Sequence, residues 1–575
     1  MYIRKEKNPV DTVNYIKSIL RNLDICVVEK DIIGYADKWY SLRLEIEELN
    51  GIGTNGKGIS LEAARASAYA ELMERLQSGF LLSRLFKKCN PRTAEDVFSY
   101  EETIELLTSL NMDQYLKNYE IRKSLIKNRF LREKQEYYNV NKKEKTYLPN
   151  WFIETDCGTN GLCAGNTAHE AILQGINEIQ ERYVRKKLFL GEIDVPTIEH
   201  SFLKNFNSLS IIKAIEQQGY MCIVKDLTCN GKFPVLGVIL IEPSMNNYVV
   251  AMGADYDIDI CLQRCITEVF QGRNFSFLSK QNIVPTFDPD SFFISTDNLE
   301  SNNNYQMSVV DNGGSYPFNI FGTQISNGEF LTAFVKGETS NEKLLEYAIK
   351  QLVADGKDIF IKDYGYLGFP TYRVFIPGMS ELCAMSAEMI EHLKSFDTFD
   401  SFYYQFSTLS YDQIRSLGNS LFSVMSIPFY QENLQMDLMT GIPIDLSNYD
   451  IDLNSAWVFL MICSLKLKHY KEASEYFRKF IKRNNMKDLS ENYQVLYIVL
   501  EYLAQGKTKE EALKASAMFD KNNFSCVLLN LEEIISVFPK CPECNKCNLI
   551  EKCCYRKWNE INDRLKKFGK RELSE

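Results

Sequence analysis

The chain has 575 residues, of which 45% are hydrophobic and 25% are charged, and it carries a formal net charge of −10. This length predicts several folded domains, since a domain commonly contains about 150 residues. The acidic balance argues against a nucleic-acid-binding protein, because affinity for the phosphate backbone depends on clustered Lys and Arg.

The N-terminus is charged over residues 1–7, where a signal peptide would need an apolar core. The most apolar helical stretch, residues 456–465, is too short to span a bilayer. We therefore expect a cytoplasmic protein without a membrane partner. The basic runs at 185–187 and 566–571 are interpreted as solvated helix faces. The cysteines interpreted as reduced core residues are Cys26, Cys222, Cys261 and Cys463.

A repeated pattern marks the first candidate site. Gly53-Thr-Asn-Gly56 recurs as Gly158-Thr-Asn-Gly161. Each copy follows a predicted strand, at 39–46 and 146–152, and precedes a predicted helix with the motif Glu-x-x-Glu-Arg. A third, diverged version spans 264–273 and has no Gly-rich lead. We therefore expect an α+β core of strand–turn–helix units, with the first two related by an approximate two-fold axis.

The helical period places acidic side chains of these units on one face. At about 100° per residue, Ser67, Glu71 and Glu74 fall within roughly 60° of one another. An exposed, ion-paired face is the ordinary interpretation of one such helix, but three occurrences favour a site. Converging carboxylates repel one another and need cations, for which Mg²⁺ is the natural candidate. The other aligned sets are Glu170, Gln174, Glu178 and Glu181 in the second helix, and Arg264, Glu268 and Gln271 in the third.

The glycine-rich segment 51–58 comes within one residue of a phosphate-binding P-loop. Gly58 stands where a P-loop needs a Ser or Thr hydroxyl for its metal, so metal ligands must come from elsewhere, and the glutamate helices can supply them. A tight strand-to-helix turn with an exposed Lys57 is an open alternative for this segment.

Taken in order, these motifs resemble the YcaO family. They are 54–58, the helix from Ser67 to Arg75, the segment from Ala164 to Glu170 with its continuation to Arg182, and Thr267 to Arg273. Two later segments, 363–368 and 374–380, resemble an enterobacterial branch of the family. The resemblance extends over about residues 1–400.

The resemblance implies an ATP site between helices, magnesium ions that bridge glutamates and phosphates, and phosphorylation of a backbone amide oxygen after a nucleophile adds. It assigns no catalytic residue in this sequence. The implied magnesium ligands are Glu71, Glu74, Glu178 and Glu181. The implied contacts to nucleotide or metal are Lys5, Thr12, Ser67, Asn166, Glu170, Arg182 and Arg273, together with the four glutamates.

The sequence departs from the family pattern in three places. Cys163 and Thr12 each stand where the pattern has serine, and the chain ends at 570–575 without the Pro-rich C-terminus of azoline-forming members. The resemblance therefore points to a sulfur-related modification, either thioamidation or support of aspartate methylthiolation in a ribosomal protein. The expected partners are a peptide or protein substrate and a sulfur-transfer or radical enzyme, and a homodimer stays open. The alternative is a non-catalytic, ATP-binding scaffold that recruits a radical methylthiotransferase to its target.

We expect an ATP-binding domain at 1–400, a helical domain at 401–535 and a cysteine-rich tail at 536–575. Two predicted helical hairpins, at 456–484 and 492–520, resemble tetratricopeptide units, and either a peptide groove or plain packing suits them. In the tail, closely spaced thiolates in a reducing compartment favour a metal site over disulfides. Zinc and an iron–sulfur cluster both suit such ligands. The expected ligands are Cys541, Cys544, Cys547 and Cys553.

Overall fold

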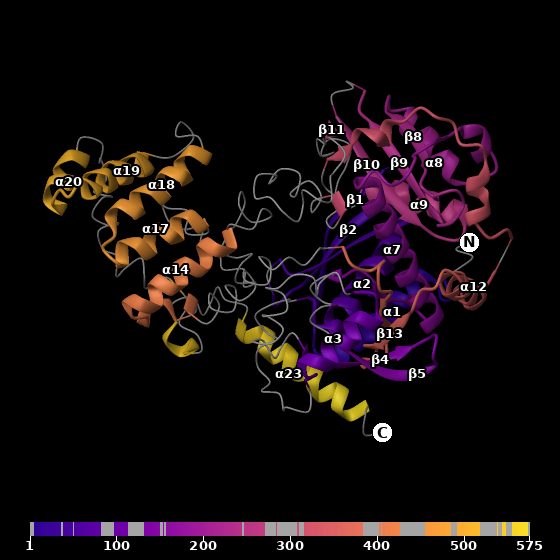
Figure 1. Ribbon diagram of the computed structural model, residues 1–575, viewed down its shortest axis with the longest axis horizontal. Helices are drawn as coiled ribbons and strands as arrows, with labels where there is room; N and C mark the ends of the chain where they lie inside the picture. Colours follow the sequence, from indigo (N-terminus) through magenta and orange to yellow (C-terminus); the bar gives the residue numbers. More distant parts are fainter. Residues whose placement is uncertain are drawn as a thin grey trace. The chain divides into compact units, whose positions relative to one another are not determined.

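The structure is a computed structural model. It describes residues 5–35, 38–49, 51–81, 97–112, 132–149, 153, 157–243, 247–270, 283–284, 308–309, 315–337, 339–382, 402–403, 405–425, 455–484, 491–517, 538, 543–547 and 555–572. The chain divides into two compact units (Figure 1). Unit 1 comprises residues 1–81, 91–387 and 561–575, and unit 2 comprises 82–90 and 388–560. The division at 400 and the separate tail from 536 stay predictions.

Unit 1 begins with helix α1 (Pro9–Asn22), and the Asn8 side chain caps it by accepting a hydrogen bond from the Val10 N–H. An antiparallel sheet follows, in the order β1 (Val27–Tyr35), β2 (Trp39–Ile46) and β3 (Gly53–Gly58). Helix α2 (Leu61–Ser78) comes next and ends at Gly79 in the left-handed conformation. The glycine-rich segment is thus a strand paired along its length with β2, not the turn that the sequence predicts.

A second antiparallel sheet has the order β5-β4-β13-β14-β6. Its strands are β4 (Lys134–Asn139), β5 (Glu144–Pro149), β6 (Leu162–Ala164), β13 (Phe360–Asp363) and β14 (Thr371–Phe375). The helices of this part of the chain are α3 (Tyr100–Ser109), α7 (Ala168–Phe189) and α12 (Asn341–Ala354), of which α7 packs on β6 and β14 and α12 packs on α7. The strand expected at 146–152 is present as β5, which begins earlier, and residues 150–152 lie outside the described residues.

A third antiparallel sheet has the order β10-β9-β8-β7. Its strands are β7 (Thr197–Ile198), β8 (Met221–Asp226), β9 (Val235–Ile241) and β10 (Tyr248–Ala254). Helices α8 (Ser208–Glu216) and α9 (Ile258–Val269) pack on it, and β11 (Ile283–Val284) pairs in parallel with β12 (Tyr316–Pro317). The mixed α and β content agrees with the fold class that the sequence predicts.

Three strand–helix units are joined in a cycle within unit 1. Each helix packs on the strand that precedes it, so that α2 lies on β3, α7 on β6 and α9 on β10. Each helix also packs on the strand of the next unit: α2 on β6, α7 on β10 and α9 on β3. This closed cycle of three takes the place of the two-fold pair that the sequence predicts.

One close crossing of strand and helix recurs in the three units. A Cβ atom at Gly56 of β3 would lie 2.7 Å from the Ala68 Cβ, and one at Gly253 of β10 would lie 2.8 Å from the Cys265 N. In the second unit the glycine is on the helix, since a Cβ at Gly175 would lie 2.8 Å from the Cys163 Sγ. Each crossing therefore needs one glycine, on either the strand or the helix.

These crossings correct the register of the repeat. The strand residues at the three crossings are Gly56, Cys163 and Gly253, and each is followed at the same spacing by a helix N-cap, at Ser60, Thr167 and Asp257. The third unit therefore does have a glycine lead, Gly253. Gly158 and Gly161 have positive φ and form a turn before β6, so that Gly158-Thr-Asn-Gly161 is not the counterpart of Gly53-Thr-Asn-Gly56. In the corrected register the equivalent glutamates are Glu71, Glu178 and Glu268, and likewise Glu74 and Glu181.

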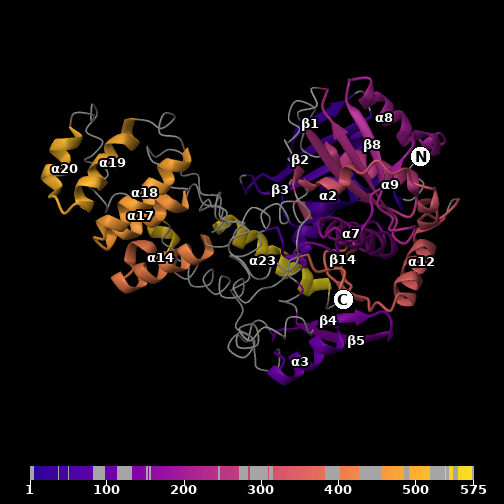
Figure 2. The ribbon, with the colours of Figure 1, turned by 45° about the horizontal axis from the view of Figure 1, so that its top comes forward.

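Helix α7 runs through the interior of unit 1, between the sheet of β8–β10 and the sheet that contains β14 (Figure 2). Its apolar side chains join a core with residues of both sheets and of α12, such as Ile176, Val250, Val374 and Leu345. A polar residue that points inward from α7 is therefore enclosed on several sides.

Unit 2 is helical among its described residues. Consecutive helices pack on one another, and Arg478 of α18 pairs with Glu501 of α19 at 2.6 Å. The two helical hairpins expected from the sequence are present, whereas their tetratricopeptide character stays a prediction. The helices are α14 (Tyr411–Met425), α17 (Ala456–Lys466), α18 (Tyr470–Asn484), α19 (Glu491–Ala504) and α20 (Lys509–Ser516). From residue 561 onward, α23 (Tyr555–Glu572) belongs to unit 1, where the Arg564 Nη1 donates a hydrogen bond to the Asp24 O at 2.6 Å.

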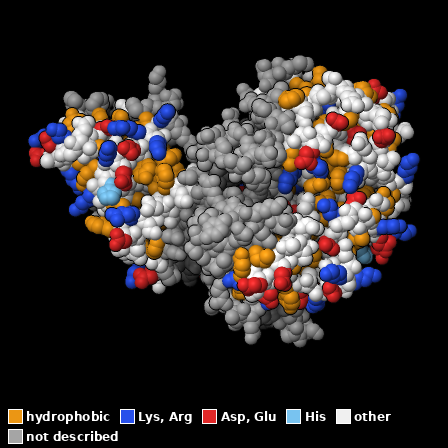
Figure 3. Space-filling view, in the orientation of Figure 1, with side chains coloured by type: hydrophobic (Ala, Val, Ile, Leu, Met, Phe, Trp, Pro, Cys, Tyr) orange, Lys and Arg blue, Asp and Glu red, His pale blue; other side chains and the backbone are white. Residues whose placement is uncertain are grey.

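Among the described helices, none has the length and apolarity needed to cross a membrane. On the visible face of each unit, Lys and Arg are interspersed with Asp and Glu (Figure 3). Lys566 and Lys567 are exposed on α23, as expected, but Arg185 is buried, so the interpretation of 185–187 as a solvated face is wrong there. Cys222, Cys261 and Cys463 are buried as expected, whereas Cys26 is exposed.

Candidate functional site

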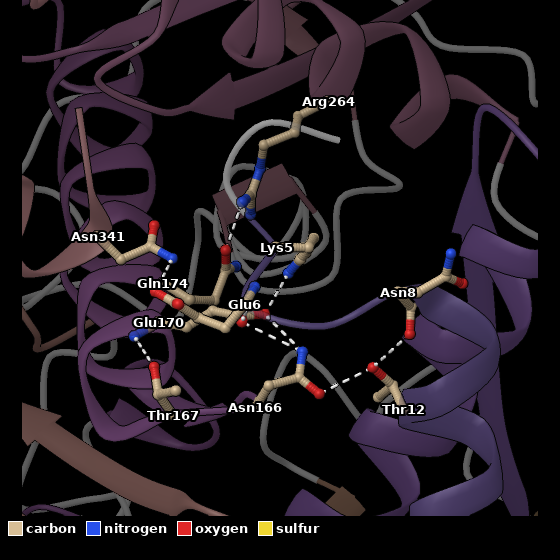
Figure 4. A network of polar contacts seen from close by, with 10 residues as sticks. All are labelled: Lys5, Glu6, Asn8, Thr12, Asn166, Thr167, Glu170, Gln174, Arg264 and Asn341. Carbon is tan, nitrogen blue, oxygen red and sulfur yellow. Dashed lines mark hydrogen bonds and ion pairs between the residues drawn. The ribbon is translucent and has the colours of Figure 1, made fainter. Parts of the chain in front are cut away.

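The segment before α1 lies across the first turn of α7 (Figure 4). The Lys5 Nζ donates to the Glu170 Oε1 at 2.9 Å, and the Glu6 backbone N–H donates to the Glu170 Oε2 at 3.1 Å. The Asn166 Nδ2 also donates to Glu170, and the Thr12 hydroxyl donates to the Asn166 Oδ1 at 2.8 Å. Four residues that the resemblance assigns to one site, Lys5, Thr12, Asn166 and Glu170, are thus brought together from distant parts of the sequence.

Glu170 is held as a carboxylate in this network. Its burial acts to raise its pKa, but Lys5, the Glu6 N–H and Asn166 more than offset that, so the pKa of Glu170 lies below its ordinary value. The Thr167 hydroxyl accepts from the Glu170 backbone N–H and begins α7, which fixes the position of Glu170 at the positive end of the helix.

The first glutamate helix, α2, carries its charges as a compact ion-paired group. The Arg75 guanidinium lies 3.6 Å from Glu71 and 3.3 Å from Glu74. Burial nevertheless raises the pKa of Glu74 to about 8, against the opposing effect of Arg75, and both Glu71 and Glu178 raise it further. The Glu74 carboxyl therefore lies where more positive charge would stabilise its ionised form.

The second glutamate helix, α7, contributes Glu178 and Glu181. Burial raises the pKa of Glu178, Arg182 opposes that effect, and the charge of Glu181 adds to it. Glu181 accepts a hydrogen bond from the Arg185 Nη2 at 2.7 Å, and the Arg182 Nη1 donates to the Val309 O at 2.9 Å. Glu178 of α7 thus lies close enough to α2 to raise the pKa of Glu74, and Arg75 of α2 acts on Glu178.

Two residues of the third unit, which the sequence aligns on one helix face without assigning them to the site, take part in it. Glu268 of α9 forms an ion pair with Lys57 of β3, and Arg264 of α9 donates a hydrogen bond to the Gln174 Oε1 (Figure 4). Burial and Arg264 lower the pKa of Lys57 to about 8, although Glu181, Glu71 and Glu178 act in the opposite direction. The equivalence of Glu268 with Glu71 and Glu178 was a usable signal, but the apparent lack of a glycine lead concealed it.

The donor set suits a hard cation. Glu71, Glu74, Glu178 and Glu181 offer oxygen ligands of the kind that Mg²⁺ prefers, and two of them have raised pKa values that a cation would lower again. In the part of the chain that the structure describes, no three His, Cys, Asp or Glu side chains lie close enough together to hold one metal ion. A Mg²⁺ ion with only one or two protein carboxylates and with nucleotide phosphates as further ligands fits this arrangement.

The remaining predicted residues are placed as follows. Ser67 lies on α2, one turn before Glu71. Arg273, Cys541 and Cys553 lie outside the described residues, as does the side chain of Cys544, and Cys547 is half-buried. The cysteine metal site therefore stays a prediction.

Residues 55–380 match the sequence model of a family described as YcaO cyclodehydratase, ATP- and Mg²⁺-binding. The ribosomal protein S12 methylthiotransferase accessory factor YcaO of Escherichia coli is 25% identical over 399 residues, and an uncharacterised protein of Haemophilus influenzae is 26% identical over 391 residues. Each alignment covers 65% of this chain and 65% of the relative. The chain thus spans somewhat less than two thirds of the length of these relatives.

Solved structures of low identity also align with the chain. A YcaO protein from Methanopyrus kandleri bound with AMPPCP and Mg²⁺ has a TM-score of 0.45 and 18% identity, covering 65% of this chain and 92% of its own. A heterocyclase in complex with substrate and cofactor has a TM-score of 0.43 and 16% identity, covering 66% of this chain and 53% of its own.

Proposed function

Because the chain belongs to the YcaO family, we propose that it binds ATP and magnesium and activates an amide or carboxylate oxygen of a peptide or protein. The observation that carries this proposal is the electrostatic coupling of carboxylates from α2 and α7. Burial and the charges of Glu71 and Glu178 raise the pKa of Glu74, which is the behaviour of a site built to receive cations.

The proposed division of roles follows from charge. Glu71, Glu74, Glu178 and Glu181 would hold magnesium, which would neutralise charge on the phosphoryl group as it moves. Asn166 and Glu170 at the start of α7, with Lys5 and Thr12 across from them, would position the nucleotide. Arg182 would stabilise phosphate charge, since burial and Arg185 lower the pKa of Arg182 and an anion nearby would offset both effects.

We propose a sulfur-related modification as the reaction, either thioamidation or support of ribosomal-protein aspartate methylthiolation. The name of the E. coli relative, an accessory factor of a ribosomal protein S12 methylthiotransferase, supports the second of these. A protein substrate and a sulfur-transfer or radical enzyme would then be partners.

The same name favours one other candidate function. In it, the chain is a non-catalytic ATP-binding scaffold, and the helical hairpins α17–α18 and α19–α20 recruit a radical methylthiotransferase to its target.

Phosphate release separates the two functions. The chain is incubated with MgATP alone and with added ribosomal protein S12, and free phosphate is measured. Release that rises with S12 supports the enzyme acting on this target, whereas nucleotide binding without release supports the scaffold. If MgATP is neither bound nor hydrolysed, both proposals are wrong.

A further inference from the structure

A buried arginine lies directly beside one of the proposed magnesium ligands. Arg185 follows Glu181 by one turn of α7, its side chain is 0% exposed, and its Nη2 donates to the Glu181 Oε1 at 2.7 Å. The order Glu then Arg along a helix is the favourable one for such a pair.

This guanidinium makes little use of its other donors. Among the described residues, the Arg185 Nε and Nη1 are buried and have no hydrogen-bond partner, and the same holds for the hydroxyl of Tyr316. Burial raises the pKa of Tyr316, and the nearby charge of Arg185 opposes that rise. A buried ion pair with so few hydrogen bonds adds little net stability, since replacing both partners of such a pair by apolar residues is often neutral or stabilising. A role other than stability therefore accounts better for an arginine here.

The equivalent positions of the first unit show what the arginine adds. In the corrected register Ser78 of α2 corresponds to Arg185, and its hydroxyl donates to the Glu74 backbone O at 2.7 Å rather than to a carboxylate. Glu74 is instead approached at 3.3 Å by Arg75, whose side chain is 21% exposed and which also serves Glu71. Of these two units, the second has a buried arginine dedicated to one carboxylate oxygen, and the first has no such arginine among its described residues.

We propose that Arg185 is a positioning residue for Glu181. By its hydrogen bond, Arg185 holds one oxygen of the Glu181 carboxylate so that the other oxygen is presented to magnesium. The inference rests on the proposed function, because it needs Glu181 to be a metal ligand. Loss of a residue that hydrogen-bonds to a metal ligand commonly lowers metal affinity about 10- to 100-fold. We therefore expect a loss of about that size in metal affinity when Arg185 is replaced.

The test measures binding of Mn²⁺, a spectroscopic substitute for Mg²⁺, in the presence of the non-hydrolysable analogue AMPPCP by electron paramagnetic resonance. The variants are R185M, R185K, E181Q and R185M/E181Q. The control is K187M, which breaks the ion pair between Lys187 of the same helix and Glu192 beyond the end of that helix. We expect R185M to weaken Mn²⁺ binding about 10- to 100-fold, R185K to recover part of that loss because an ammonium can donate one hydrogen bond, and K187M to bind as wild type.

The double variant decides whether Arg185 acts through Glu181. If it does, R185M/E181Q binds Mn²⁺ no more weakly than E181Q alone. Additive losses, or unchanged or tighter binding by R185M, would overturn the inference, the last because Arg185 would then compete with the metal. If R185M does not fold, R185Q must show the same weakening, because its side chain is too short to reach Glu181 as arginine does and carries no positive charge. Unchanged binding by E181Q would contradict the proposed function itself, which separates that failure from failure of the inference alone.

Discussion

Lys57 of β3 forms an ion pair with Glu268 of α9 and so joins the first strand–helix unit to the third. Both side chains are largely buried, at 26% and 19% exposed. The pair closes the cycle on the side of the carboxylates, because the charges of Glu71, Glu178 and Glu181 also act on Lys57. The alternative interpretation of segment 51–58, a turn with an exposed lysine, is therefore wrong.

The pair should be measurable in a double-mutant cycle. K57M and E268Q are each expected to lower the melting temperature, since each leaves a partly buried charge without this partner. The double variant K57M/E268Q should lose less unfolding free energy than the two single variants lose together, and this difference, the coupling energy, should be about 1 kcal/mol or more. Thermal unfolding of the four proteins checks this, and additive losses would show that the two charges do not interact.

The raised pKa of Glu74 predicts that the metal-free protein becomes less stable as pH rises. An unfolded chain loses this proton near the ordinary value, whereas the folded protein keeps it up to about pH 8, chiefly because the carboxyl is buried. Between these limits the unfolded state binds fewer protons, so the stability contribution falls with rising pH, by at most about 1.4 kcal/mol per unit for one proton.

The measurement is denaturant unfolding of metal-free wild type and E74Q at pH 5, 6, 7 and 8. E74Q lacks the titrating carboxyl, so its free energy of unfolding should fall less steeply with rising pH than that of wild type. E105Q, at an exposed position of α3, is the matched control and should follow wild type. Parallel curves for wild type and E74Q would mean that the Glu74 carboxyl does not keep its proton in the folded state.

The strand–helix crossings predict which glycines tolerate a side chain. A Cβ at Gly56 would lie 2.0 Å from the Ala64 carbonyl O, and backbone cannot move aside cheaply, so G56A should cost about 3 kcal/mol or more. G418A is the control, because the nearest atom to its Cβ would be 3.9 Å away and its helix should gain slightly. Melting temperatures compare the two, and a G56A protein as stable as wild type would refute the close packing.

Much of the core follows from local pattern, and the rest does not for identifiable reasons. The acidic stripes of α2 and α7 follow from helical period, because Glu71 and Glu74, or Glu178 and Glu181, need only local geometry to share a face. The sequence predicts no glycine lead for the third unit because that unit lacks the motif Gly-Thr-Asn-Gly. Packing, however, requires only one glycine per crossing, which Gly253 supplies. Arg185 was expected in solvent because a basic run does not reveal that sheets enclose its helix on both sides.

Thr12, in the first turn of α1, should matter for nucleotide binding. The Thr12 side chain is buried and its hydroxyl donates a hydrogen bond to Asn166. T12V removes this hydrogen bond and leaves the Asn166 amide oxygen without that donor, which costs about 1–3 kcal/mol. We expect ATP affinity to fall about tenfold or more in T12V and to be kept in T12S, which retains the hydroxyl. Calorimetric titration with MgATP tests this, and equal affinities for T12V and wild type would remove Thr12 from the site.

The central claim is that glutamates of α2 and α7 hold the magnesium that ATP chemistry requires. E74Q and E181Q keep side-chain shape but remove a ligand charge, so nucleotide turnover should fall by about a hundredfold or more, the scale seen when one preorganised interaction with the transition state is lost. Folding should survive in E74Q because the Glu74 carboxyl already keeps its proton in the metal-free protein, and in E181Q because the amide oxygen can still accept the hydrogen bond from Arg185. The measurement is magnesium-dependent ATP binding by calorimetry together with phosphate release for wild type, E74Q and E181Q. The account predicts folded variants with weakened MgATP binding and lost turnover, and equal affinity and turnover in all three proteins would contradict it.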